Sequence, residues 1–340
     1  MPIQPPLCLV AGKSGGHIVP ALSYAHEYRQ TSPDTPILFF STDAKLDTSI
    51  VLSYPFISTY VPIKLDNFPR KKVWRYPAFI WHLINSFLTS IKYLWSQAPK
   101  RVISMGGYIS IPVCLSAWLL RIPIELFELN ASPGQASLFL AKFATKISVC
   151  FEQALNFFPA NKTYKREYPL RFTDADRISK NQACIYLGLD PKKKVLLVLG
   201  GSQGSHFINN LLKDLTKEYA QELKDIQILH QTGDADVGAM RMVYADGSFT
   251  AQVFDYKNDL QYCYSAADLV IARAGAGTLF ELAFFSKKSI IIPLEADTTT
   301  HQLDNALAMA QRYPDLFIVL NQSSIKNDHN LFLKTLIISI

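Results

Sequence analysis

This sequence of 340 residues lacks most features of disulfide-rich, zinc-binding or exported proteins. Its five cysteines show no C-x-x-C spacing and stand beside no histidine, so the sequence predicts neither a disulfide framework nor a zinc site. Positive charges exceed negative ones by only six. This scattered excess argues against nucleic acid as a partner but suits an anionic membrane or a phosphorylated substrate. Residues 1–6 contain neither a basic region nor a long apolar segment, so we expect no export signal.

Long hydrophobic runs are also missing. The most apolar window, Tyr76–Trp95, is interrupted by polar residues and repeats its apolar side chains at helical spacing. Because a membrane-spanning helix would be more uniformly apolar, we interpret this window as an amphipathic helix. The cations Arg70-Lys71-Lys72, with Trp74 and Trp81 nearby, suit docking on an anionic lipid surface. A solvated charge run beside an ordinary core helix explains them equally well.

The chain alternates short apolar runs with amphipathic segments, which predicts parallel sheets in an α/β fold. The expected strands are Leu7–Val10, Ile37–Ser41, Arg101–Ser104, Ile124–Glu128, Val195–Leu199, Ile226–Gln231, Gln252–Phe254, Asp268–Ile271 and Ser289–Pro293. The expected helices are His17–Gln30, Phe79–Trp95, Pro112–Leu120, Gln135–Phe143, Phe207–Leu223, Thr278–Phe285 and His301–Arg312.

We predict two doubly wound domains with a cleft between them, residues 1–165 and 166–340. The polar, weakly periodic stretch Pro159–Lys180 is the expected seam. The stretch Asn330–Ile340 is apolar enough for a last helix, and one option for it is to pack back across the first domain.

Four glycine-rich turns follow expected strands, at Gly12–His17, Gly106–Ser110, Gly200–Ser205 and Gly275–Thr278. A strand, a glycine turn and a helix N-terminus together present backbone N–H groups and a positive dipole end to a phosphate. Any single turn of this kind is more often a simple connection. Four of them in two similar domains suggest two phosphorylated ligands, one in each domain. Gly12-Lys13-Ser14 is not a P-loop, because the glycine required five positions earlier is Leu7.

Two titratable residues lie beside these turns, and each has two explanations. Glu281, three residues after Thr278, is either half of a capping box or a carboxylate that faces sugar hydroxyls. His17 opens a helix, where the helix dipole favours its neutral form. It is therefore either a general base or a residue that caps the helix. The pairs Asp174-Ala175-Asp176 and Asp234-Ala235-Asp236 stand alone in polar stretches, so we interpret them as surface loops and predict no essential metal.

Seven ordered motifs between Leu7 and Arg312 resemble those of the MurG family. These are peripheral membrane transferases that move N-acetylglucosamine (GlcNAc) from UDP-GlcNAc onto lipid I to make lipid II. The motifs are Ser14-Gly15-Gly16-His17, Gly106-Gly107-Tyr108-Ile109-Ser110, Gly200-Gly201-Ser202-Gln203-Gly204, His230-Gln231-Thr232-Gly233, Ala267-Asp268-Leu269-Val270, Arg273 to Glu281, and His301-Gln302 with Asn305. The resemblance implies a GT-B fold and an inverting, metal-independent transfer at the cytoplasmic face of the inner membrane. It leaves other cell-wall synthesis proteins open as partners.

By position, the resemblance implies that the second domain holds the donor. Ser202 and the start of the Ala276–Phe280 segment would meet the diphosphate, and Glu281 would bind the ribose hydroxyls. Gln302, with His301 beside it, would bind the sugar. The whole donor-binding set implied is Ser14, Gly15, Gly16, Asn130, Arg171, Ser202, Lys257, Ala276, Gly277, Thr278, Leu279, Phe280, Glu281, His301 and Gln302.

The first domain would bind lipid I, with His17 as the base for the C4 hydroxyl of the muramyl sugar. The acceptor-binding set implied is Ser14, Gly15, Gly16, His17, Gly106, Gly107, Tyr108 and Asn130. The chain departs from the family here, with Gly12-Lys13-Ser14 for Gly-Gly-Thr and Phe127-Glu128-Leu129-Asn130 for His-Glu-Gln-Asn. In the second domain, Gly277 replaces a usually larger residue. Two alternatives stay open: a related transferase with another lipid acceptor, such as diacylglycerol, and a sugar-nucleotide-binding scaffold without turnover.

Overall fold

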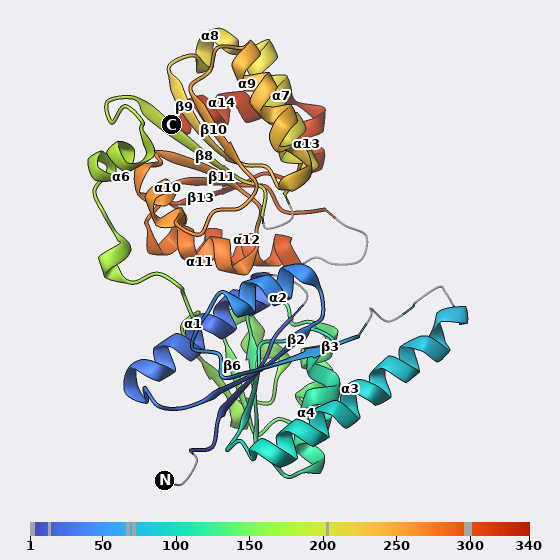
Figure 1. The fold of residues 1–340 in the computed structure, drawn as a ribbon. Coiled ribbons are helices and arrows are strands. Elements are labelled where there is room, and N and C mark those ends of the chain that lie inside the picture. Colours follow the sequence, from blue (N-terminus) through green and yellow to red (C-terminus); the bar gives the residue numbers. More distant parts are fainter. Residues whose placement is uncertain (1–3, 13–14, 66–68, 70–72, 202–203, 296–300) are drawn as a thin grey trace. The chain divides into compact units, whose positions relative to one another are not determined.

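The structure is a computed structural model that describes residues 4–12, 15–65, 69, 73–201, 204–295 and 301–340. It divides into two compact units, Met1–Arg171 and Phe172–Ile340. Each unit contains one wholly parallel sheet with helices on both faces (Figure 1), which confirms the predicted α/β class with two doubly wound domains.

The first unit is built on a seven-stranded sheet in the order β3-β2-β1-β4-β5-β6-β7. Its strands are β1 (Leu7–Val10), β2 (Ile37–Thr42), β3 (Thr59–Ile63), β4 (Val102–Ser104), β5 (Ile124–Glu128), β6 (Lys146–Val149) and β7 (Thr163–Lys165). Its helices are α1 (Gly15–Thr31), α2 (Lys45–Leu52), α3 (Tyr76–Gln97), α4 (Ser110–Leu119) and α5 (Gln135–Leu140), with 3-10 turns η1 (Val73–Arg75), η2 (Glu152–Phe157) and η3 (Ala160–Lys162).

The second unit is built on a six-stranded sheet in the order β10-β9-β8-β11-β12-β13. Its strands are β8 (Lys194–Leu199), β9 (Ile226–Gln231), β10 (Ala251–Phe254), β11 (Leu269–Ala272), β12 (Ser289–Ile291) and β13 (Phe317–Val319). Its helices are α6 (Lys180–Leu187), α7 (His206–Glu218), α8 (Ala220–Leu223), α9 (Val237–Asp246), α10 (Leu260–Ala266), α11 (Ala276–Phe284), α12 (His301–Arg312), α13 (Gln322–Asn327) and α14 (His329–Ser339), with 3-10 turns η4 (Asp174–Asp176) and η5 (Asp234–Asp236).

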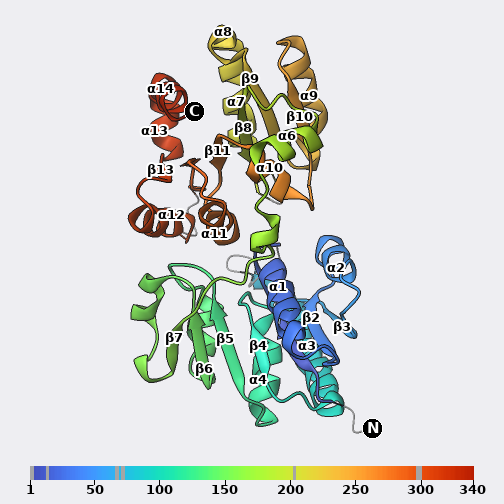
Figure 2. The same ribbon diagram turned by 90° about the vertical axis from the view of Figure 1, so that its left-hand side faces the viewer.

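The central strands are buried on both faces, which explains why they are continuous apolar runs rather than alternating ones. Leu7–Val10 and Leu269–Ala272 are buried at every position. In each sheet the chain winds outward in one direction, returns to the middle and then winds the other way. This reversal places a switch point between β1 and β4 in the first sheet. In the second sheet the switch point lies between β8 and β11 (Figure 2). Ligands of doubly wound sheets bind at the carboxyl ends of the strands at such points.

One helix prediction needs correction. The expected helix Phe207–Leu223 is two helices, α7 and α8, because Tyr219 leaves the helical region with φ −127° and ψ 40°. The last helix, α14, contributes to the core of the second unit. Its side chains Phe332 and Leu336 are fully buried in the core that also contains Leu196 of β8.

Helix α3 exposes an apolar face. It buries Ser86, Ser90 and Leu94, and the hydroxyl of Ser116 in α4 donates to the carbonyl of Phe87 at 3.0 Å. The side chains turned outward are Ile80, Trp81, Ile84, Leu88 and Trp95, each about half exposed or more. Among the described residues, no helix combines the length and apolar character needed to cross a membrane.

Candidate functional site

The four glycine turns follow the four strands at the two switch points. In the first sheet, β1 pairs directly with β4, and the turns at Gly12 and Gly106 come after them. In the second sheet, β8 pairs directly with β11, and the turns at Gly200 and Gly275 come after them. Because parallel strands end at the same edge, each unit brings two of these turns together at one corner.

In the first unit this corner contains the histidine that the sequence singled out. His17 lies in the first turn of α1, with Gly15 and Gly16 before it. Gly106 has φ +91°, and a methyl group added to it would lie 3.6 Å from both Cδ2 and Nε2 of the His17 ring. The same methyl group would lie 3.6 Å from the hydroxyl oxygen of Ser137 in α5. The imidazole therefore lies beside the β4–α4 turn. A general base for a ligand bound at this corner would need to lie there.

The two turns of this corner are in close backbone contact. Gly107 has φ +82°, and a Cβ at this position would lie 3.4 Å from the carbonyl oxygen of Gly12. A Cβ on Gly12 would meet the backbone nitrogen of Thr42 at 3.2 Å. The positive φ at both Gly106 and Gly107 explains the glycine pair. Tyr108, the next residue, is half-buried at the start of α4.

A buried carboxylate organises the loop after β5. Glu128, 3% exposed, accepts hydrogen bonds from the backbone N–H of Asn130 at 3.0 Å, its side-chain amide at 3.1 Å and the N–H of Gly134 at 3.3 Å. The Ser137 hydroxyl also bonds to it. Burial raises the pKa of Glu128 above its usual range, although these donors act in the opposite direction. Glu128 thus fixes Asn130, while Phe127 and Leu129 beside it are buried apolar side chains.

In the second unit the corresponding corner is the N-terminus of α11. Gly275 is its N-cap, with extended φ and ψ, and Ala276, Gly277 and Thr278 form the first turn. The N–H groups of such a first turn have no partner within the helix and point at any ligand beyond it. Leu279 differs from its neighbours, because its side chain is fully buried and its N–H donates to the Gly275 carbonyl. Leu279 therefore packs the helix onto the sheet, and Phe280 is half-buried.

Glu281 is held by a tyrosine from another helix. Its side chain is 8% exposed, and its Oε2 accepts a 2.7 Å hydrogen bond from the hydroxyl of Tyr264 in α10. The Tyr264 ring stacks on Phe285 at 5.1 Å and meets the edge of Phe172 at 6.0 Å. This packing fixes the carboxylate. No pattern in the sequence points to Tyr264, because Tyr264 and Glu281 are 17 residues apart and lie on different helices.

The β8–α7 turn packs directly on the end of β9. A Cβ on Gly204 would lie 2.1 Å from the carbonyl oxygen of Thr232, so only glycine fits there. Asn209 of α7 donates to that carbonyl at 3.1 Å and contacts Nε2 of His230 at 3.1 Å. His230 also bonds the Tyr244 hydroxyl, and burial lowers the pKa of His230 to about 3. The histidine of the His230–Gly233 motif is therefore a neutral structural group.

The start of α12 lies next to the same corner. The side-chain amide of Asn305 donates to the carbonyl of Ala274, at 3.4 Å. Gln302 accepts a 2.9 Å hydrogen bond from the N–H of Leu294 through its side-chain oxygen. His301, the first residue of α12, is half-buried. Helices α11 and α12 therefore present the predicted diphosphate and sugar residues side by side.

The other residues predicted to bind the donor are Lys257, Arg171, Ser14 and Ser202, and fewer contacts describe their places. Lys257, after β10, pairs with Asp259 at 3.2 Å, with its ammonium 6.0 Å from the centre of the Phe254 ring. Arg171 is the last residue of the first unit and is half-buried. Ser14 and Ser202 lie outside the described residues.

The two Asp-x-Asp pairs are short 3-10 turns, η4 and η5. In η4, Asp176 caps the turn through Thr173. In η5, Asp236 pairs with His206 at 2.8 Å and accepts from Asn209 at 2.6 Å. Each carboxylate named here thus has a structural partner within the second unit.

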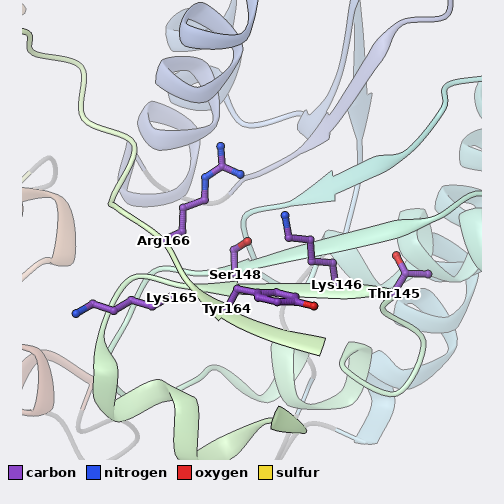
Figure 3. A pocket seen from close by; sticks show the side chains of 6 residues that line it. All are labelled: Thr145, Lys146, Ser148, Tyr164, Lys165 and Arg166. Carbon is purple, nitrogen blue, oxygen red and sulfur yellow. The ribbon is translucent and has the colours of Figure 1, made fainter. Parts of the chain in front are cut away.

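A polar pocket of about 440 Å³ lies on the first sheet, away from the glycine turns. It is lined by Thr145, Lys146, Ser148, Tyr164, Lys165 and Arg166 (Figure 3). Lys146 and Arg166 share the buried carboxylate of Glu125, at 3.3 and 3.8 Å. The pocket lies along β6 and β7 at the edge of the sheet, whereas the predicted site residues of this unit gather after β1 and β4.

Comparison with known proteins identifies the family. The glycosyltransferase family 28 N-terminal domain matches residues 7–149, and the family 28 C-terminal domain matches residues 195–331. The UDP-N-acetylglucosamine–N-acetylmuramyl-(pentapeptide) pyrophosphoryl-undecaprenol N-acetylglucosamine transferase of Thermodesulfovibrio yellowstonii is 32% identical over 89% of this chain and 82% of its own. A crystal structure of MurG from Acinetobacter baumannii is similar with a TM-score of 0.71, at 25% identity over 98% of this chain and 91% of that one. The chain belongs to the MurG family.

Membership of the MurG family makes the protein a glycosyltransferase, as the sequence predicted. The fold agrees with more distant enzymes as well. A UDP-glucose: anthocyanidin 3-O-glucosyltransferase in complex with UDP, 12% identical, has a TM-score of 0.61 over 93% of this chain and 86% of its own. At that identity the likeness concerns the fold alone. Together with the MurG structure it confirms the predicted GT-B fold.

Proposed function

We propose that this protein transfers GlcNAc from UDP-GlcNAc to the C4 hydroxyl of the muramyl sugar of lipid I, which gives lipid II. The observation that carries this proposal is the match to both family 28 domains, in order, together with a relative of that activity at 32% identity over 89% of the chain. The second unit binds the donor and the first unit binds the acceptor.

In the donor unit, the first turn of α11 receives the diphosphate. Its backbone N–H groups and positive dipole end stabilise the two phosphates. Glu281, five residues after Ala276, accepts hydrogen bonds from the ribose hydroxyls. The hydrogen bond from Tyr264 holds the carboxylate in the orientation that this requires. Because Leu294 occupies the side-chain oxygen of Gln302, the amide NH₂ group of Gln302 is the part that binds the sugar, with His301 beside it. Lys257 lies at the uracil edge and Arg171 completes the donor set, which also takes in Gly15, Gly16 and Asn130.

In the acceptor unit, the N-terminus of α1 and the Gly106–Gly107 turn bind the diphosphate of lipid I. Tyr108 and Asn130 flank it, Asn130 being fixed by Glu128. The His17 imidazole accepts the proton of the C4 hydroxyl, and the oxygen attacks the anomeric carbon of GlcNAc. The bond from that carbon to UDP breaks, its electron pair leaves with UDP, and the configuration inverts. The N–H groups of α11 stabilise the charge on the departing diphosphate.

The apolar face of α3 (Ile80, Trp81, Ile84, Leu88 and Trp95) docks on the membrane that carries lipid I. The buried face of this helix holds Leu94 and two serines, while five large apolar side chains are exposed on its outer face, which is unusual for a helix whose outer face meets only water. Trp74 and Arg75, both exposed, lie in η1 directly before α3. Interfacial tryptophan with a cation suits an anionic lipid surface, so the protein is peripheral at the cytoplasmic face of the inner membrane.

The test mixes the purified protein with UDP-GlcNAc and a lipid I analogue in detergent and follows UDP release. We expect release that depends on the acceptor. Release with diacylglycerol, but not with the lipid I analogue, would replace the proposed acceptor. Tight UDP-GlcNAc binding without any release would favour the scaffold instead.

A further inference from the structure

Arg273 is a buried cation at the corner of the donor unit. It follows β11 directly, is 8% exposed, and its backbone N–H donates to the Leu199 carbonyl at the end of β8. Burial lowers the pKa of Arg273 to about 10, so it remains charged at neutral pH. Among the described residues no carboxylate is within ion-pair distance of its guanidinium, although Glu295 is close enough to favour its charged form. A buried cation is costly unless its N–H donors are satisfied, so the hydrogen-bond partners of Arg273 matter.

The guanidinium joins three segments that are far apart in the sequence. Its Nε and Nη2 donate to the hydroxyl of Ser205, at 3.0 and 2.7 Å. Its Nη1 donates to the carbonyls of Ile292 and Pro293 after β12, at 3.1 and 3.2 Å. Its Nη2 also donates to the side-chain oxygen of Gln322 in α13, at 2.9 Å. A rigid planar fork of this kind fixes the relative positions of all its acceptors.

Two of these segments lead to proposed donor-binding residues. Ser205 is the N-cap of α7, accepts from the Ile208 N–H at 3.3 Å, and ends the Gly200–Ser205 turn. Pro293 precedes Leu294, whose N–H is bonded to the side chain of Gln302. The guanidinium therefore bonds directly to Ser205, the last residue of the Gly200–Ser205 turn. It also bonds to the carbonyl of Pro293, the residue before the one that contacts Gln302.

We propose that Arg273 is a positioning residue of the donor site, which sets the β8–α7 turn and the Gln302 segment at the spacing that a nucleoside-diphosphate sugar requires. This inference rests on the proposed function. Arg273 does not touch the ligand; it acts through Ser205 and the Pro293 carbonyl. Its positive charge lies between the N-termini of α7 and α11, where it adds to the two helix dipoles and favours a dianionic ligand.

The test compares Arg273→Lys, Arg273→Met and Ser205→Ala with the wild-type protein. We measure KM for UDP-GlcNAc, KM for the lipid I analogue and UDP affinity by calorimetry. A positioning role predicts that Arg273→Met and Ser205→Ala raise the KM for UDP-GlcNAc about tenfold or more and lower the affinity for UDP by a similar factor. The KM for the acceptor stays constant, and Arg273→Lys, which keeps the charge without the fork, is intermediate. If Arg273→Met does not fold, the comparison of Arg273→Lys and Ser205→Ala with the wild-type protein is sufficient to test the inference.

Lys287→Met is the matched control. Lys287 is another largely buried cation bound to carbonyls, those of Ser265 and Ala267, but it lies near the start of β11 rather than its end. We expect this variant to lose stability and keep both KM values. Variants of Arg273 and Ser205 that change only the amount of active protein, with KM and UDP affinity unchanged, would overturn the inference. A wild-type protein that binds no UDP would instead overturn the proposed function on which it rests.

Discussion

At the residue scale, His17 is the side chain whose role is most open to direct test. Its ring stands against Gly106 at the switch point of the first sheet. Replacing His17 with alanine should reduce turnover about 10²- to 10⁴-fold, the usual contribution of a general base. UDP binding should change little, because the first turn of α11 and Glu281, which bind the diphosphate and the ribose in our proposal, lie in the second unit. UDP release and calorimetry with UDP measure the two effects.

His26→Ala is the control for this substitution, since His26 lies on the same helix but is exposed and remote from the glycine turns. It should retain wild-type turnover. If His17→Ala turns over as fast as His26→Ala, another group accepts the proton.

Glu128 gives a pH-dependent prediction. Burial raises its pKa in the folded protein above the ordinary value of 4.5. The folded state therefore holds this proton more tightly than the unfolded chain does. The stability contributed by protonated Glu128 is fully present below the unfolded pKa and is lost as pH rises through the folded pKa. Glu128→Gln cannot ionise, so the free energy of unfolding of wild type minus that of this variant should fall as pH rises above about 4.

Urea unfolding of both proteins across this pH range measures the difference and cancels the titration of all other groups. A difference that rises with pH would mean that the hydrogen bonds from Asn130 and Gly134 outweigh burial, and that the pKa is lowered.

The sequence indicated candidate site residues but not the residues that hold them. His17 and Glu281 could be singled out as candidates because each stands at a fixed distance from a glycine turn. Tyr264, which holds Glu281, and Ser205, which anchors Arg273 from 68 residues away, could not. Such contacts depend on which strands become neighbours in the sheet, and no local pattern of residues contains that information. Leu279 is the opposite case, since its place in the motif suggested a ligand contact and the structure buries it.

At the scale of elements, the backbone of the β8–α7 turn lies so close to the backbone at Thr232 that Gly204 leaves no room for a side chain. Gly204 has φ +75°, and its Cβ would overlap the Thr232 carbonyl. Gly204→Ala should therefore cost about 3 kcal/mol or more and abolish UDP binding, because the turn must move. Gly238→Ala in α9 meets nothing within 4 Å and should be neutral or stabilising by up to about 1 kcal/mol. Chemical denaturation and UDP calorimetry compare them. Equal effects of the two substitutions would contradict this account of the turn.

The apolar face of α3 is the second element to test. Trp81 and Trp95 are 64% and 76% exposed, so replacing both with serine should leave the stability nearly unchanged. Loss of two large side chains from a membrane contact should weaken binding to phosphatidylglycerol vesicles about tenfold or more. Turnover of a detergent-soluble acceptor should persist. Vesicle sedimentation measures the binding, and Ile185→Ser, at a 68% exposed position of the second unit, is the control. Equal vesicle binding by both variants would assign docking to another surface.

Several elements were predictable from the sequence, although buried β6 and the ten-residue helix α9 were not among those expected. The strands Leu7–Val10, Ile124–Glu128 and Ile226–Gln231 and the helix His301–Arg312 have the bounds expected from the sequence. The short edge strand Thr163–Lys165 was not anticipated, because its exposed polar residues lack the apolar run of a central strand. The break at Tyr219 was also missed, since apolar periodicity continues across it.

At the scale of the whole molecule, the described residues include one hydrophobic core within the first unit and another within the second. One core joins Val10, Val102 and Leu126 with their neighbours, and the other joins Val198, Ile271 and Phe332 with theirs. Separate cores allow the two units to unfold separately. Scanning calorimetry of the intact protein should then show two transitions. UDP-GlcNAc at a hundred times its Kd should stabilise one of them by about 2.7 kcal/mol and leave the other in place.

The donor-site variant Gly204→Ala identifies which transition belongs to the second unit, because it should lower that transition and remove its response to UDP-GlcNAc. A lipid I analogue should raise the other transition. This pattern requires that the donor is held by one unit and the acceptor by the other, each ligand stabilising the core beneath its own switch point. A single transition that either ligand raises as a whole would show that the units unfold together. A shift of the unaltered transition by UDP-GlcNAc would place the donor on the first unit and contradict the assignment of both sites.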